Sequence, residues 1–257
     1  MAEQAKLLVL LKEKRQTFIS QAVTKGLDSQ APMKNSGIEW LGDVPEGWGV
    51  LRFTRVIRKI EQGWSPNASS DSCEPNSWGV LKLSSIKNGV FIPSENKMLL
   101  AGTDPDHSIE VKKGDFLVTR ANTLELVGDA CVASDIDGYR LMLSDLIYRI
   151  HLNPGHDPRY YCKLLTSTYG RSLIETDARG SSMSMAKISQ GHIYSWMVPV
   201  PPLNDQTAIV NALDAETTRI DALIAEGQKA VDLLKERRSA LISAAVTGKI
   251  DVRALAI

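Results

Sequence analysis

A long C-terminal run with helical periodicity constrains the fold of this chain more than any other feature. After Pro201-Pro202, Asn204 or Asp205 can cap a helix start, and from there apolar residues recur at three- and four-residue steps, the pattern of a helix with one apolar stripe. The run contains no proline and one glycine, Gly227, so the helix is expected to reach Val246, over roughly 60 Å at about 1.5 Å per residue. A stripe of that length needs a partner, and the run is therefore predicted to be a spacer or a dimerisation arm.

A related sequence occurs near the N-terminus. Leu10–Thr24 aligns with Leu233–Thr247 at an offset of 223 residues, and 11 of 19 positions are identical when the alignment continues to Asp28 and Asp251. A repeat that brackets a domain, instead of tiling the chain, is not typical of a solenoid. It predicts two equivalent helices, at 1–28 and 201–251, with a globular domain at 33–200 between them.

Apolar residues of the two helical segments are expected to pack against each other or against the helices of a second copy. The packing positions are Leu11, Phe18, Ile209, Leu213, Ile220, Leu223, Leu234 and Leu241. The mixed charges of Lys235–Arg238, repeated at Lys12–Arg15, are typical of residues that solubilise a coiled coil and set its pairing. Phosphate contact along the helix is the alternative interpretation of these charges.

Composition limits the class of protein. An apolar content of 43% and a charged content of 23% are ordinary for a globular chain of 257 residues, and no run of about 18 apolar residues predicts a membrane span. The N-terminal segment carries acids and bases at helical spacing, so it is interpreted as mature helix and not as a signal peptide. Three cysteines, an odd number placed far apart, indicate reduced thiols and a cytoplasmic location. The four histidines lack metal-ligand spacing, so no metal and no cofactor is expected.

The charge balance restricts how the chain can bind an acidic partner. The net charge is zero, with 30 basic and 30 acidic residues, and residues 29–205 hold 18 basic against 20 acidic residues by count. Any nucleic-acid-binding face must therefore be a local cluster on a mixed surface. Binding by the isolated chain should be modest and sensitive to salt.

The middle of the chain carries the signals of a mixed α/β domain, which together with the long helices predicts an α+β fold. Strands are expected at 80–83, 89–92, 130–133, 144–151 and 196–200, and a strand–turn–strand at 109–120 with Lys113-Gly114-Asp115 as its turn. Helices are expected at 159–176 and, shorter, at 187–191. Two tryptophans and four glycines between Met33 and Phe53 indicate a compact loop packed on the domain. Loops rather than the sheet are expected to carry the polar chemistry.

Motifs for catalysis are missing or incomplete. The Pro201-Pro202 pair lacks the acid and the aromatic residue of an adenine methyltransferase loop, and the sequence contains no GxSxG elbow. Residues 105–112 imitate a PD…ExK nuclease signature. Only three residues separate Asp106 from Glu110, too few to place two carboxylates on adjacent strands around one metal ion. No catalytic residue is predicted.

Two blocks of the sequence are similar to segments of a known family. Residues 36–53 (SGIEWLGDVPEGWGVLRF) and 198–224 (VPVPPLNDQTAIVNALDAETTRIDALI) resemble hallmark segments of the specificity (S) subunits of type I restriction-modification systems. Residues 112–120 (KKGDFLVTR) and 178–189 (ARGSSMSMAKIS) are similar too, in the family's order. The resemblance covers essentially the whole chain, but a full subunit has two recognition domains, and this sequence has one.

The resemblance implies a non-catalytic subunit that recognises double-stranded DNA. In that family a target recognition domain reads one half of a bipartite site, and long helices pack as an antiparallel coiled coil that separates two such domains. The implied partners are the methyltransferase (M) subunit and, through it, the restriction (R) subunit. A half-length chain also makes a homodimer an expected assembly. The competing hypothesis is a structural coiled-coil module that binds protein and has no specific DNA recognition.

Loop residues that are able to reach phosphates or base edges are the candidates for DNA contact. Arginine and lysine pair with guanine, asparagine with adenine, and serine or threonine with bases or phosphates. Arg120 and Asn122 are favoured because they lie where a strand ends and the chain turns polar. Each basic residue taken singly is otherwise interpreted as solvated surface, and the Gly-Ser loop after Arg179 as a turn. The candidates are Lys82, Ser84, Ser85, Lys87, Arg120, Asn122, Thr123, Arg179, Ser181, Ser182 and Lys187.

Overall fold

The computed structural model describes residues 2–74, 77–178 and 185–250 of the chain. The chain divides into two compact units. The helical unit comprises Met1–Phe18 and Ala212–Ile257, and the central unit comprises Ile19–Asn211. Helices and sheets are both present, so the predicted α+β class is confirmed.

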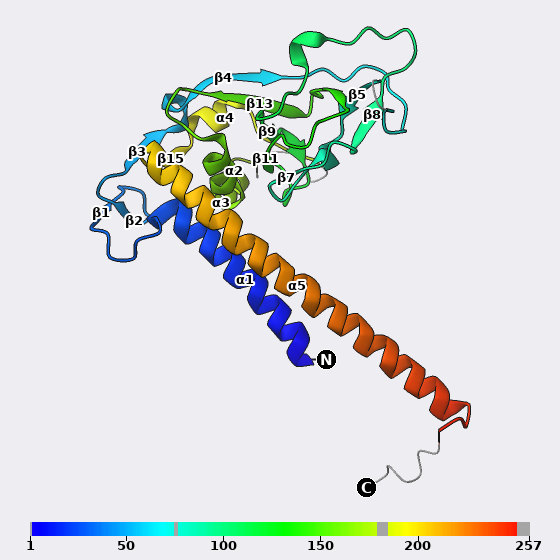
Figure 1. Cartoon of the computed structure of the whole chain (residues 1–257). Coiled ribbons are helices and arrows are strands. Elements are labelled where there is room, and N and C mark those ends of the chain that lie inside the picture. The colour runs from blue at the N-terminus through cyan, green and yellow to red at the C-terminus, as the bar shows by residue number, and fades with distance from the viewer. Residues whose placement is uncertain (1, 75–76, 179–184, 251–257) are drawn as a thin grey trace. The chain divides into compact units, whose positions relative to one another are not determined.

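Two long helices form the helical unit. Helix α1 spans Ala2–Lys25 and α5 spans Leu203–Val246, so α5 ends where the periodicity predicts. The two helices run antiparallel (Figure 1). The Arg15 guanidinium pairs with the Asp221 carboxylate at 2.9 Å, and Leu8, earlier on α1, faces Gly227, later on α5. A Cβ atom on Gly227 would lie 2.8 Å from Cδ2 of Leu8. The glycine therefore leaves space for the side chain of Leu8.

The seam between these helices follows a regular alternation of three- and four-residue steps. Leu213, Thr217, Ile220 and Val231 are buried, and Ile224, Gly227 and Leu234 are half-buried between and after them. This spacing is that of a heptad repeat. Leu11 and Phe18 on α1 are half-buried.

Two of the packing positions expected from the sequence lie outside this seam. Leu223 is 44% exposed because it stands one position from Ile224, which occupies the seam. Leu241 continues the repeat seven residues after Leu234, but it is 50% exposed. The described part of α1 begins at Ala2, and no described residue of α1 reaches the level of Leu241. Neither leucine therefore packs within this chain.

The central unit is built on two principal sheets (Figure 1). The four-stranded sheet is antiparallel and has the order β11-β9-β13-β4, with β11 at Ala130–Val132, β9 at Phe116–Thr119, β13 at Ile147–Leu152 and β4 at Ile57–Gln62. The three-stranded sheet has the order β12-β5-β8, with β12 at Arg140–Met142, β5 at Trp78–Leu81 and β8 at Asn96–Met98. In it β12 and β5 are parallel, whereas β5 and β8 are antiparallel.

Four short ladders complete the strands of the central unit. They pair β1 (Met33–Asn35) with β2 (Asp43–Pro45), β3 (Gly49–Arg52) with β15 (Met197–Val200), β6 (Ile86–Lys87) with β7 (Val90–Phe91), and β10 (Ala121–Asn122) with β14 (Ala186–Lys187). The helices are α2 (Pro158–Thr166), α3 (Thr168–Ala178) and α4 (Gln190–Ser195), and the 3₁₀ helices are η1 (Phe53–Arg55), η2 (Leu83–Ser85) and η3 (His107–Ile109).

The helices of the central unit differ from the expected ones in two places. The helix expected at 159–176 is broken at Ser167, whose hydroxyl donates to the Leu164 carbonyl at 2.6 Å and accepts the Gly170 N–H at 3.2 Å. The short helix expected at 187–191 begins at Gln190 instead, because Ser189 caps it and forms a capping box with His192. The preceding residues, 186–187, form β14.

The strand–turn–strand expected at 109–120 keeps its turn, but the residues before the turn form η3 and an isolated bridge at Glu110 instead of a strand. Lys112–Asp115 forms a turn, in which the Asp115 carboxylate accepts the N–H of Lys112 at 2.8 Å. The regular strand therefore begins at Phe116.

Apolar packing holds the central unit together. One cluster of buried residues lies between the two sheets and includes Leu117, Cys131, Leu141 and Ile147. On α2, Tyr160 is fully buried, and its hydroxyl donates to the Val23 carbonyl at 2.8 Å. Burying such apolar surface contributes roughly 25 cal/mol per Å². Within the described residues, no helix is both long and apolar enough to cross a bilayer.

Candidate nucleic-acid interface

A short antiparallel ladder brings together candidate residues that are far apart in the sequence. Ala121 pairs with Lys187 and Asn122 with Ala186, and the Ile188 N–H donates to the Arg120 carbonyl at 2.9 Å. Arg120, Asn122 and Lys187 therefore lie on neighbouring backbone segments. Lys187 is paired with Ala121, so its side chain lies on the other face of the ladder from that of Asn122. Lysine and arginine supply phosphate-binding groups, and arginine and asparagine supply base-reading groups.

Arg120 is held by the turn that precedes β13. Its N–H donates to the Leu146 carbonyl at 2.7 Å, and its guanidinium reaches the Asp145 carbonyl at 3.4 Å. Burial raises the pKa of the nearby Tyr148 phenol above its ordinary value, and the positive charge of Arg120 partly offsets this effect. The side chain of Arg120 is half-buried, so its position is fixed while part of it faces solvent.

Asn122 is the second residue of β10, and Thr123 follows it in the chain. The side-chain oxygen of Asn122 accepts the N–H of Thr123 at 2.9 Å. Asn122 is half-buried and Thr123 is exposed. This bond orients the Asn122 amide and leaves its NH₂ group and the second lone pair of its oxygen to meet a base.

Asp145 ties the same turn to the loop after β4. The Ser65 hydroxyl donates to the Asp145 carboxylate, and the Asp145 N–H donates back to the Ser65 hydroxyl at 3.2 Å. Gln62 donates to the Asp145 carbonyl at 3.0 Å. These contacts hold loop 63–69 beside the end of β13. Asp145 and Ser65 were not predicted from the sequence, because they are 80 residues apart and no local sequence pattern indicates their contact.

Loop 63–69, the turn at 144–146 and the β5–β8 pair enclose a pocket of about 440 Å³. Lys82, one of the candidates for DNA contact, lines it together with Lys97. The full lining is Ser65, Pro66, Asn67, Ala68, Val80, Leu81, Lys82, Leu83, Lys97, Ser144 and Leu146. Asn67, Lys97 and Ser144 were not among the residues predicted from the sequence to contact DNA.

The serines of the 83–88 segment have structural roles. Ser85 is fully buried, and its hydroxyl donates to the Lys82 carbonyl at 2.7 Å, so this candidate closes the η2 turn and does not face solvent. Ser84 is exposed, but its hydroxyl donates to the Glu95 carboxylate. The structure thus corrects the expectation that Ser85 contacts DNA.

Lys87 and Thr123 lie on segments that are joined through Asp129. Lys87 is exposed on β6, and the next residue, Asn88, donates its N–H to the Asp129 carboxylate at 2.6 Å. Burial raises the pKa of Asp129, and the N–H groups of Asn88 and Ala130 partly offset that rise. Asp129 therefore anchors the β6–β7 hairpin to the 123–129 loop.

Arg171 fixes the 123–129 loop from α3. Its guanidinium donates to the carbonyls of Val127 at 2.6 Å and Leu124 at 3.0 Å. The remaining candidates, Arg179, Ser181 and Ser182, lie outside the described residues.

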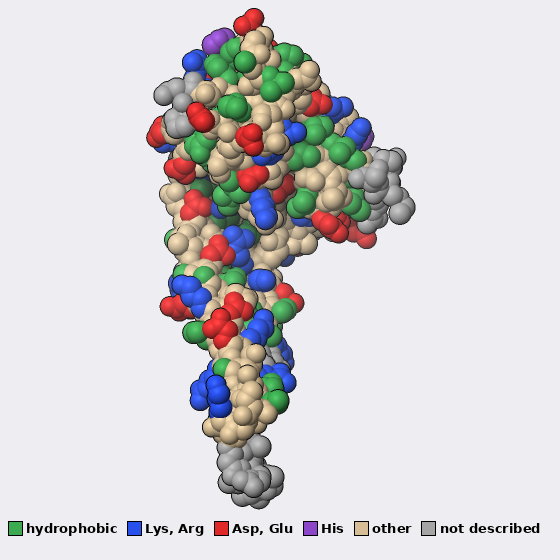
Figure 2. All heavy atoms as spheres, turned by 90° about the vertical axis from the view of Figure 1, so that its right-hand side faces the viewer, with side chains coloured by type: hydrophobic (Ala, Val, Ile, Leu, Met, Phe, Trp, Pro, Cys, Tyr) green, Lys and Arg blue, Asp and Glu red, His purple; other side chains and the backbone are tan. Residues whose placement is uncertain are grey.

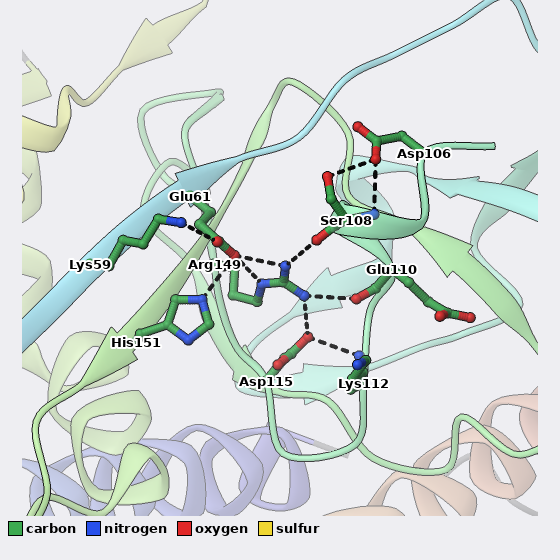
Figure 3. Close-up of polar contacts among 9 residues, drawn as sticks. All are labelled: Lys59, Glu61, Asp106, Ser108, Glu110, Lys112, Asp115, Arg149 and His151. Carbon is green, nitrogen blue, oxygen red and sulfur yellow. Dashed lines mark hydrogen bonds and ion pairs between the residues drawn. The ribbon is translucent and has the colours of Figure 1, made fainter. Parts of the chain in front are cut away.

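A buried charge network surrounds Arg149 on β13 (Figure 3). Arg149 pairs with Glu61 at 2.7 Å and with Asp115 at 3.0 Å, and it donates to the carbonyls of Glu110 and Ser108. Because Glu61, Arg149 and Asp115 belong to or adjoin β4, β13 and β9, the network fixes the relative register of these strands.

The carboxylate of Glu61 is the most strongly shifted acid of this network. Burial by itself raises its pKa, but hydrogen bonds from His151, Lys59 and Arg149 outweigh that effect and lower the pKa from 4.5 to about 2. The nearby Asp106, part of the nuclease-like sequence, accepts the N–H of Ser108 at 2.9 Å and so caps η3. Across the described ranges, no group of three or more His, Cys, Asp or Glu residues is arranged to hold a metal ion.

Charges of both signs are interspersed over the face drawn in Figure 2. This distribution agrees with a net charge of zero. Basic candidates such as Lys87 and Lys187 therefore act within a mixed field, and the binding strength depends on local geometry more than on long-range attraction.

Comparison with known proteins relates the whole chain to one group. No family model matches the chain. The specificity subunit of the type I restriction enzyme EcoEI from Escherichia coli is 30% identical over 207 residues, which cover 79% of this chain and 34% of that protein. The putative type I restriction enzyme MjaX specificity subunit of Methanocaldococcus jannaschii is 25% identical over 96% of this chain and 53% of its own length. Over most of its length the chain is thus similar to specificity subunits of type I restriction enzymes.

Solved structures extend this similarity to the fold. The HsdS subunit from Thermoanaerobacter tengcongensis superimposes with a TM-score of 0.54 at 17% identity, over 97% of this chain and 54% of that one. A chain from a structure of the assembly and conformational transition of the type I R-M system gives a TM-score of 0.64 at 17% identity, over 95% and 53%. The chain thus spans about a third to a half of the length of the relatives it matches.

Proposed function

We propose that this chain recognises double-stranded DNA by sequence for a type I restriction-modification complex, and that it is not itself an enzyme. Residues 33–200 act as a target recognition domain that reads one half of a bipartite site. The observation that carries this proposal is the β10–β14 ladder, which joins the backbone segments of Arg120, Asn122 and Lys187 in a chain that is similar to specificity subunits. The complex acts in the cytoplasm.

Recognition follows from the chemistry of these side chains. The Arg120 guanidinium is suited to the O6 and N7 acceptors of guanine, and the Asn122 amide to adenine. Lys187 and Lys87 supply phosphate contacts that position the domain but carry no sequence information. The mixed surface charge keeps non-specific binding weak, so that base contacts decide which duplexes are bound.

The helices at 1–28 and 201–251 serve as the spacer that docks the M subunit and, through it, the R subunit. Exposed apolar side chains at the far end of α5 support such docking. Leu233 is 65% exposed, Ile242 is 54% exposed and Val246 is 83% exposed. Apolar groups at this spacing gain free energy when another helix covers them. A second copy of the chain supplies such helices, so the proposed assembly is a homodimer that reads two half-sites.

The test of DNA recognition is selection from a pool of random duplexes by the chain bound to the M subunit encoded beside it. Enrichment of one short motif is the expected result. A pool that remains random after several rounds contradicts the proposal and favours the competing hypothesis, a coiled-coil module that binds protein alone.

The test of assembly is the mass in solution, measured by light scattering with and without the M subunit. A species of about 56 kDa, twice the 28.2 kDa chain, is expected without it. A larger complex is expected with it. A chain that stays at 28.2 kDa contradicts the homodimer, and a chain that does not bind the M subunit contradicts the docking role.

A further inference from the structure

The pocket beside β5 and β8 combines features of a ligand site that strand packing alone does not explain. It holds about 440 Å³ and has an apolar floor formed by residues such as Val80 and Leu146. Its polar groups come from four segments that are separate in the sequence, at 65–67, at 82, at 97 and at 144. Pockets with an apolar floor and a few convergent polar groups are typical binding sites.

Ser144 is the buried polar group in this pocket. Its side chain is 5% exposed, and its hydroxyl has no hydrogen-bond partner among the described residues. A buried hydroxyl without a partner is costly, and native proteins pair nearly all such groups. Because Ser144 lines the pocket, a ligand there can accept its hydrogen bond.

Two lysines converge on the same space from neighbouring strands. Lys97 lies directly opposite Val80 in the antiparallel β5–β8 pair, so their side chains share one face of the sheet. Lys82 follows Val80 by two residues in extended backbone and points to that face as well. The ion pairs found among the described residues include neither Lys82 nor Lys97.

The polar groups of the pocket are mainly hydrogen-bond donors. Lys82 and Lys97 carry positive charge, Ser144 offers a hydroxyl, and the exposed Asn67 adds an amide NH₂. Donors around an anion, with apolar surface beside them, match a phosphate group and the sugar attached to it. The pocket also adjoins Arg120 through Asp145 and Leu146, so its occupant lies next to the proposed base-reading residues.

We infer that this pocket binds a phosphodiester and its deoxyribose from the backbone of the recognised DNA. Lys82 and Lys97 contact the phosphate oxygens, Ser144 gives its hydroxyl to the same phosphate, and the apolar floor packs against the sugar. The inference rests on the proposed function and adds Lys97, Ser144 and Asn67 to the interface. The contact positions the duplex and carries no base preference of its own.

The lysines are tested through the salt dependence of DNA affinity. With the selected duplex and the M subunit complex, Lys82→Gln and Lys97→Gln should each reduce the slope of log affinity against log salt by about 0.9. Both variants should lose affinity for all sequences alike and keep the selected motif. Lys113→Gln is the matched control. Lys113 is an exposed lysine before the start of β9, at the opposite end of that strand from Arg120. An unchanged slope in both variants overturns the inference.

Ser144→Ala separates binding from folding. Removal of an unpaired hydroxyl should leave the thermal midpoint of the free chain unchanged or higher, while affinity for DNA falls about fivefold to tenfold. An unchanged affinity, or a lowered midpoint, contradicts the assignment of this hydroxyl to the ligand.

The DNA motif that each variant selects distinguishes a failure of the phosphate assignment from a failure of the proposed function. A changed motif in the Lys82, Lys97 or Ser144 variants shows that the pocket reads bases, which overturns the phosphate assignment alone. A wild-type chain that selects no motif overturns the proposed function, and this inference with it.

Discussion

Gly63 crosses the backbone of Leu143 so closely that a Cβ atom on Gly63 would overlap the carbonyl group of Leu143. The next residue, Trp64, donates its N–H to that same carbonyl at 3.0 Å. This crossing brings Ser65 to Asp145 and so places loop 63–69 over the pocket. The geometry of the proposed interface therefore depends on a residue without a side chain.

Gly63→Ala should destabilise the chain because the added methyl group has no space. Overpacking of this kind typically costs about 1–3 kcal/mol in the free energy of unfolding. Gly47→Ala is the matched control, since a Cβ atom at Gly47 meets nothing within 4 Å. Urea denaturation of both variants measures the difference. Equal stability of the two would show that the Leu143 backbone moves aside at little cost.

Acid should weaken the central unit through Glu61. The pKa of this carboxyl is about 2 in the folded chain against 4.5 ordinarily, so its contribution is complete above about pH 4.5 and is lost as the pH falls toward 2. With a side chain 21% exposed, screening limits that contribution to about 1–2 kcal/mol. Unfolding free energies from about pH 6 to about pH 2.5 should fall more steeply in the wild type than in Glu61→Gln. Parallel curves would contradict the role assigned to Glu61.

The base-reading role of the ladder is tested by Arg120→Ala combined with Asn122→Ala. Each good base contact contributes about 1–3 kcal/mol, so the double variant should bind the selected duplex at least about tenfold more weakly. Its preference for that duplex should relax as well. Arg58→Ala is the control, because Arg58 is exposed near the start of β4, away from Gln62 and the pocket loop. Wild-type affinity in the double variant removes this loop from the interface.

A pair of glutamate substitutions tests the helical seam. Ile220 is 2% exposed, and Ile220→Glu buries a charge there, which should cost about 2–4 kcal/mol in the stability of the helical unit. Leu223 is 44% exposed, and Leu223→Glu should change the stability of the single chain by less than about 0.5 kcal/mol. Circular dichroism during heating measures both effects.

The same Leu223→Glu variant examines self-association. A homodimer that covers this face should dissociate, and light scattering should then give the mass of one chain. A variant that keeps the dimer mass shows that Leu223 lies outside the contact between copies, while a destabilised monomer would contradict its exposed position on α5.

Local patterns were sufficient to predict the long elements. The three- and four-residue spacing of apolar residues up to Val246 predicted α5 with its correct end, and the repeat at Leu10 predicted its counterpart α1. The change from strand to polar sequence at Arg120 marked the place where β9 ends. These features depend on neighbours within a few residues, which the sequence displays directly.

Long-range pairing was beyond the reach of such patterns. The β10–β14 ladder joins Asn122 to Ala186, and two-residue strands have no periodicity of their own. The choice of Ile224 over Leu223 for the seam depends on where α1 lies, because both residues are apolar. Ser85 was interpreted as a polar loop residue, although its hydroxyl donates to the Lys82 carbonyl within the η2 turn. In each case a tertiary contact decided between alternatives that were locally equivalent.

The most direct test of sequence-specific recognition compares the affinity of the wild-type chain, in complex with the M subunit, for the selected duplex and for a scrambled duplex of equal length. Both affinities are measured by fluorescence anisotropy at one salt concentration, because phosphate contacts alone bind any sequence. The account predicts a preference of roughly a hundredfold or more for the selected duplex. Equal affinity for the two duplexes would contradict it.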